Sequence, residues 1–152
     1  MKINIYYHVL LENHWELIVR EQLGLIKRSG LYDAVENIKI GALGLKSEEL
    51  KLREIVASFD KCEIFHSEDV KLYEFWTLNI LHKDALNDKP FYAIYIHTKG
   101  ASNGKLPGGE YWRRYMNEYI LSKWKDCQRA LRKGFDTCGV KLIQYKRYRN
   151  EL

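Results

Sequence analysis

One short stretch of the sequence gathers groups that can hold an anion and transfer a proton. Residues 97–105 read HTKGASNGK and follow the apolar run 91–96. An imidazole, ammonium groups, hydroxyls and flexible glycine backbone are the groups with which proteins hold a diphosphate. Neither a GxxxxGK(S/T) pattern nor a GxGxxG pattern occurs, which excludes a P-loop and a dinucleotide fingerprint. By composition alone, an ordinary polar surface loop explains the stretch about as well as a phosphate site.

Other candidate ligands lie close to this stretch in the expected fold. Arg113 and Arg114 open the helix that follows it, and an arginine can donate two hydrogen bonds to phosphate oxygens. Trp112 beside them could stack on a ring, although core packing is the favoured interpretation. Apart from His97, only His8 lies at the end of an expected strand. No pair of histidines or carboxylates has convincing metal-ligand spacing, so no metal site is predicted.

Strands alternating with helices must position these residues. Apolar patterns predict strands at 2–11, 37–43, 61–66, 91–96 and 136–143. Helical spacing predicts helices that begin near Asn13, at Ser47, at Ser67 and at Glu110, the last continuing to about Lys133. This order predicts an α/β domain with a mainly parallel sheet and right-handed crossovers. Since 91–96 is apolar on both faces, we expect it to be a central strand.

Parallel sheets bind ligands at the carboxyl ends of their strands, where the strand order reverses. The segments that leave the first strand and the strand at 91–96 are therefore expected to form the functional edge. These segments are 8–14 and 97–109.

Length and composition indicate one domain. The chain has 152 residues, 46% of them hydrophobic, which predicts a single α/β domain over 1–144 followed by a basic tail at 145–152. Its three cysteines form no CxxC pair, so buried free thiols in a reducing compartment are expected rather than disulfides or zinc. No apolar run is long enough to span a bilayer, and 2–11 is better explained as a strand than as a signal peptide. These features predict a cytoplasmic protein.

Positive charge is concentrated late in the chain. The net charge is +5, and residues 123–152 hold nine lysines and arginines against three acidic residues. This bias suits an anionic partner, such as a sugar nucleotide, an acidic membrane surface or a nucleic acid. A solvated helix face with a charged tail explains it equally simply, and on charge alone that explanation is favoured.

The order of several motifs resembles a family of glycosyltransferases. HTKG at 97–100, WRRYM at 112–116, then Trp124, Cys127, Leu131 and DTCGV at 136–140 resemble members found in bacterial surface-polysaccharide clusters and large DNA viruses. The likeness covers roughly the last third of the chain. It implies a Rossmann-like, GT-A-like domain of three αβα layers. The implied activity is transfer of a sugar from a nucleotide-sugar donor to a glycan or lipid-linked acceptor.

The resemblance also assigns roles to residues. Donor binding is expected at His8, His97, Thr98, Lys99, Gly100, Ser102, Arg113 and Arg114. Asp136 is the nearest candidate for a catalytic base, although an acidic residue at a helix-to-strand turn is more often a cap or turn former.

Two departures from the family pattern matter. The Asp-x-Asp motif with which metal-dependent GT-A enzymes hold a divalent ion is replaced here by His97-Thr98-Lys99. We therefore expect binding without a divalent metal, with Lys99 and His97 neutralising the diphosphate. Relatives also continue past the Gly-Val segment, so the acceptor side is expected to be incomplete in this chain.

Two rival functions are kept. The first is a non-catalytic α/β module that binds an anionic ligand or a protein partner. The second is nucleic-acid binding through the basic C-terminal region and its tyrosines, which no recognised motif supports, so no nucleic-acid partner is expected.

Overall fold

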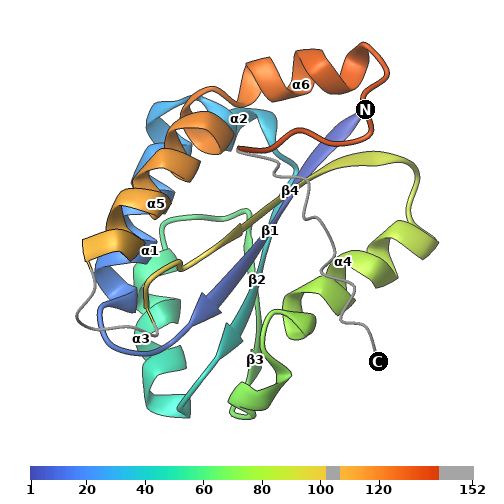
Figure 1. Ribbon diagram of the computed structural model, residues 1–152. Coiled ribbons are helices and arrows are strands. Elements are labelled where there is room, and N and C mark those ends of the chain that lie inside the picture. The colour runs from blue at the N-terminus through green and yellow to red at the C-terminus, as the bar shows by residue number, and fades with distance from the viewer. Residues whose placement is uncertain (102–106, 141–152) are drawn as a thin grey trace, which may run out of the picture.

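The computed structural model describes residues 1–101 and 107–140, and its centre is a parallel β-sheet (Figure 1). The strands of this described part are β1 (Lys2–Leu10), β2 (Asn37–Leu43), β3 (Cys62–Ser67) and β4 (Phe91–His97). They lie in the order β3-β2-β1-β4, and every pairing is parallel. The predicted α/β fold with a parallel sheet is confirmed, and its layers make it Rossmann-like.

Helices cover both faces of the sheet, as right-handed crossovers require. From β1 the chain moves outward through α1 (Trp15–Arg28), α2 (Leu31–Ala34) and β2, and then through α3 (Lys46–Val56) to β3. It returns through η1 (Val70–Leu72) and α4 (Phe75–Asn87) to β4, on the other side of β1. Figure 1 shows α4 alone on one face, with α1, α3 and α5 (Pro107–Asn117) on the opposite face.

The central strand β1 has two chemically different faces. Ile3, Ile5, Tyr7 and Val9 are buried in the core beside α1, as the alternation of the sequence predicts. The other face meets α4 with polar groups. There the Tyr6 hydroxyl donates to Asp84 Oδ2 at 2.7 Å, and Lys39 Nζ on β2 lies 2.7 Å from the same oxygen. Charged hydrogen bonds therefore join α4 to the sheet.

Gly41 allows α4 to lie directly on the backbone of β2. A Cβ at this position would stand 2.0 Å from Thr77 Oγ1 and 2.9 Å from Thr77 Cβ. Thr77 is fully buried, and its hydroxyl lies 2.9 Å from His8 Nδ1. The missing side chain on β2 is therefore what brings α4 within reach of β1.

Three of the predicted features are corrected by the structure. β4 is not central: among the described residues it pairs only with β1, and of its apolar side chains Ile96 is buried whereas Tyr92 and Ile94 are only partly buried. No strand begins at 136–140, and 141–143 lies outside the described residues. Cys138 is exposed rather than buried, whereas Cys62 and Cys127 are partly buried.

The predicted helix starts are also shifted. Ser47 does not cap α3, which begins at Lys46 after an extended Leu45. Ser67 still belongs to β3, and the side chain of Asp69 caps the short η1 turn by accepting a hydrogen bond from the Lys71 amide. α3 therefore begins one residue before the predicted cap, and the cap of η1 lies two residues after Ser67.

The predicted long helix over 110–133 is interrupted. The π-helical turn η2 (Glu118–Ser122) separates α5 from α6 (Trp124–Arg132), and the Lys123 amide donates to Glu118 O at 3.1 Å. Beyond this turn the Trp124 indole is buried and donates to Ser29 O at 3.2 Å, at the end of α1. Among the helices of the described residues, none has the length and apolar character needed to cross a membrane.

Replacing Gly41 by alanine should destabilise the protein by about 1–3 kcal/mol, because the new methyl group overlaps Thr77 and pushes α4 off the sheet. Urea unfolding followed by circular dichroism measures this change. The matched control is Gly24→Ala in α1, where a Cβ meets only the flexible end of Arg28 and helix propensity improves. Equal stability of the Gly41→Ala variant and the wild type would contradict this account of the packing.

Candidate functional site

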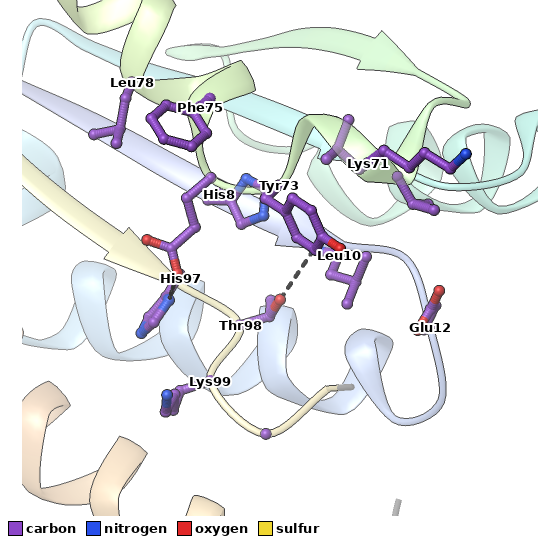
Figure 2. A pocket seen from close by; sticks show the side chains of 14 residues that line it. His8, Leu10, Glu12, Lys71, Tyr73, Phe75, Leu78, His97, Thr98 and Lys99 are labelled. Atoms are coloured by element: carbon purple, nitrogen blue, oxygen red, sulfur yellow. Dashed lines mark hydrogen bonds and ion pairs between the residues drawn. The ribbon is translucent and has the colours of Figure 1, made fainter. Parts of the chain in front are cut away.

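A cavity of about 620 Å³ lies at the carboxyl ends of β1 and β4, and we call it the β1–β4 cavity (Figure 2). The strand order reverses between these two neighbours, the place where ligands bind in open α/β sheets. His8 and His97 are register partners across the pair. The cavity is lined by His8, Leu10, Glu12, Leu43, Val70, Lys71, Tyr73, Glu74, Phe75, Leu78, His97, Thr98, Lys99 and Gly100.

Thr98 ties the end of β4 to the end of β1. Its amide donates to His8 O at 3.0 Å, and its hydroxyl accepts from the Leu10 amide at 3.1 Å. The turn then closes through a hydrogen bond from the Ala101 amide to Thr98 O at 3.0 Å, with Gly100 in the left-handed region at φ 94°. Thr98 therefore serves the geometry of the loop, while the side chain of Lys99 is left exposed on it.

The two arginines predicted to bind the donor lie elsewhere. The buried Arg113 guanidinium donates to Lys99 O at 3.0 Å and to Glu21 at 3.2 Å, so it supports the loop from behind. Arg114 is exposed and pairs with Glu110 at 2.7 Å. Neither arginine lines the β1–β4 cavity.

Asp136 and Ser102 are likewise not brought to the cavity. Asp136 follows α6 and borders a second cavity, of about 670 Å³, together with Met1 and Phe91, at the opposite ends of β1 and β4. The length of the sheet thus separates this candidate base from His97. Ser102 lies outside the described residues.

His8 is a buried imidazole that stays neutral at physiological pH. Burial lowers its pKa to about 4, an effect that the nearby Glu74 carboxylate opposes and His97 reinforces. Its Nδ1 is held by the Thr77 hydroxyl at 2.9 Å, on the first turn of α4.

The carboxylate of Glu74, which the sequence analysis missed, links β4 to α4. It accepts a hydrogen bond from the Tyr95 hydroxyl at 3.0 Å and lies 3.0 Å from His97 Nδ1. Burial alone would raise the pKa of Glu74, but His97, Tyr95 and His8 together outweigh burial and lower it. The group is therefore an ionised carboxylate between two imidazoles.

Cationic and aromatic side chains form the mouth of the cavity. The ammonium groups of Lys71 and Lys99 form no ion pair within 1–101 and 107–140. Tyr73 and Phe75 are 68% and 69% exposed although both are large and apolar. Tyr73 also has a positive φ of 46°, a conformation that is costly for a residue with a bulky side chain and that clusters at functional sites.

In the described part of the chain, no three histidine, cysteine, aspartate or glutamate side chains lie close enough together to hold a metal ion. Comparisons of the chain with protein-family models, with curated proteins and with solved structures gave no match.

The neutral state of His8 predicts how stability depends on pH. Unfolding returns the imidazole to its ordinary pKa of 6.5, so between pH 6.5 and 4 the unfolded chain binds more protons than the folded one. Stability should be fully present above pH 6.5 and fall by roughly 2–3 kcal/mol as pH drops to 4.5.

The His8→Gln variant should lose much less stability than the wild type on acidification. The free energy of unfolding in urea, measured at pH 7.5 and at pH 4.5, gives this loss for each protein. His82→Gln, which changes an exposed histidine on α4, is the control and should keep the slope of the wild type. The assignment fails if His8→Gln and the wild type lose equal stability on acidification.

Proposed function

We propose that the β1–β4 cavity binds a nucleotide sugar and that the domain is a GT-A-like glycosyltransferase acting on a glycan or lipid-linked acceptor. The observation that supports this most is the ammonium of Lys99, which forms no ion pair with the described residues and lies two residues after β4, at the reversal of the strand order. A diphosphate is the ligand chemistry that such a cation and a glycine turn recognise.

The size and lining of the cavity agree with a ligand of this kind. Its volume of about 620 Å³ is within the range that holds small molecules. Lys71 and Lys99 supply positive charge, and the exposed rings of Tyr73 and Phe75 offer flat faces to a base or a sugar. A diphosphate placed between the lysines would bring the transferred sugar toward His97 and Glu74.

Lys99 takes the place at which metal-dependent relatives of the GT-A type have an acidic motif. Its ammonium would neutralise the diphosphate directly, which makes donor binding independent of a divalent ion. The chain would then be expected to bind the donor equally well in manganese and in chelator.

A second candidate is a non-catalytic module that binds an anionic ligand at the same cavity. The distance of Asp136 from the cavity favours it, because the base expected from the sequence lies at the other end of the sheet. Donor binding without any transfer or hydrolysis in the full chain would support this alternative.

Calorimetric titration with UDP-, GDP- and dTDP-sugars tests the donor site. One nucleotide should bind in the micromolar range, and Lys99→Ala should weaken it about 10-fold or more, since a hydrogen bond to a charged group is lost. Lys83→Ala removes an exposed ammonium on α4 outside the cavity and should leave the affinity unchanged. If no nucleotide sugar binds, the proposed donor site is refuted. If binding disappears when a chelator is added, donor binding depends on a divalent metal and the proposed role of Lys99 is refuted.

A further inference from the structure

We propose that His97 is the catalytic base of the transfer reaction and that Glu74 is its positioning residue. This inference rests on the proposed function, since it assigns the proton transfer that a glycosyltransferase needs. It replaces Asp136, whose side chain lies at the far end of the sheet.

The side chains of His97 and Glu74 are in direct contact. His97 Nδ1 lies 3.0 Å from Glu74 Oε1, and both residues line the β1–β4 cavity (Figure 2). The other carboxylate oxygen is held at 3.0 Å by the Tyr95 hydroxyl, two residues earlier on β4. A carboxylate fixed in this way orients an imidazole and stabilises the imidazolium that forms when the ring takes a proton.

The hydrogen bond between His97 and Glu74 also determines which ring nitrogen of His97 can accept a proton. An ionised carboxylate can only accept, so Nδ1 of His97 carries the proton and Nε2 keeps its lone pair. The His97 side chain is 18% exposed, which leaves it accessible to a hydroxyl in the cavity. His8 cannot fill this role equally well, because it is more deeply buried and its Nδ1 is held by a neutral hydroxyl.

The charges around His97 come from several elements. Glu74 just before α4 places a carboxylate beside the ring, His8 on β1 is neutral at physiological pH, and Lys99 lies on the loop that follows β4. Tyr95 on β4 stays neutral, because burial and Glu74 raise its pKa far above the physiological range. Glu74 is therefore the charged group that the His97 ring contacts directly.

The proposed step balances without a further reactant. The acceptor oxygen forms a bond to the anomeric carbon of the donor while the bond from that carbon to the diphosphate oxygen breaks. The electron pair leaves with the nucleoside diphosphate, whose added charge faces Lys99, and the acceptor proton moves to His97 Nε2. A single displacement of this kind inverts the anomeric configuration, and water can take the place of the acceptor.

Hydrolysis of the bound nucleotide sugar by the full chain, followed across pH, tests the assignment. His97→Asn should lower the rate roughly 100-fold or more, and Glu74→Gln about 10-fold, with donor affinity kept in both. Glu74→Gln replaces the carboxylate that holds the Nδ1 proton of His97 by a neutral amide, so the preference of the ring for one tautomer should weaken. Glu63→Gln changes an exposed carboxylate on β3, outside the cavity; it is the matched control and should match the wild type.

Nitrogen NMR of the imidazoles provides a second measurement that needs no turnover. His97 should show a protonated Nδ1 and an unprotonated Nε2 in the wild type, and this preference should weaken in Glu74→Gln. The opposite tautomer in the wild type, an unchanged tautomer preference in Glu74→Gln, or wild-type hydrolysis by His97→Asn in a protein that still binds the donor overturns this inference alone. A wild-type chain that binds no nucleotide sugar refutes the proposed function itself.

Discussion

The parallel pairing of β1 with β4 is the interaction on which the candidate site depends. It places His8 beside His97 although long stretches of chain separate them, and the last rung of the ladder runs from the Thr98 amide to His8 O. The crossovers reverse direction between these two strands, with α1 on one face of the sheet and α4 on the other. The cavity is a direct consequence of that reversal.

The two faces of β1 have different roles: one packs in the apolar core, and the other carries polar side chains. The face toward α1 is apolar and buries the core, whereas the face toward α4 holds Asn4, Tyr6 and His8, with Asn4 Oδ1 left without a partner among the described residues. Burying polar groups costs free energy unless they are hydrogen-bonded. A polar face next to the cavity is the kind of local conflict that proteins keep at functional sites.

Periodicity in the sequence was enough to predict β1 to β4 and the edge at which their loops meet, since an alternating or wholly apolar run of this length fits few other structures. It could not identify β4 as an edge strand, because an apolar run does not show how many neighbouring strands pair with it. Glu74 was missed for a different reason: its role depends on the path of α4 across β1, and nothing beside it in the sequence marks it. The π-helical turn at 118–122 changes the spacing of apolar residues too little for the sequence pattern to reveal it.

The π-turn η2 holds one residue more in its ring than an α-helical turn does. That extra residue sets the rotational phase of α6 relative to α5, since each residue of an α-helix turns the chain by about 100°. With one residue fewer, Trp124 would rotate away from Ser29 and the apolar side of α6 would face water. An insertion or deletion at this point therefore changes the orientation of the last helix more than its length.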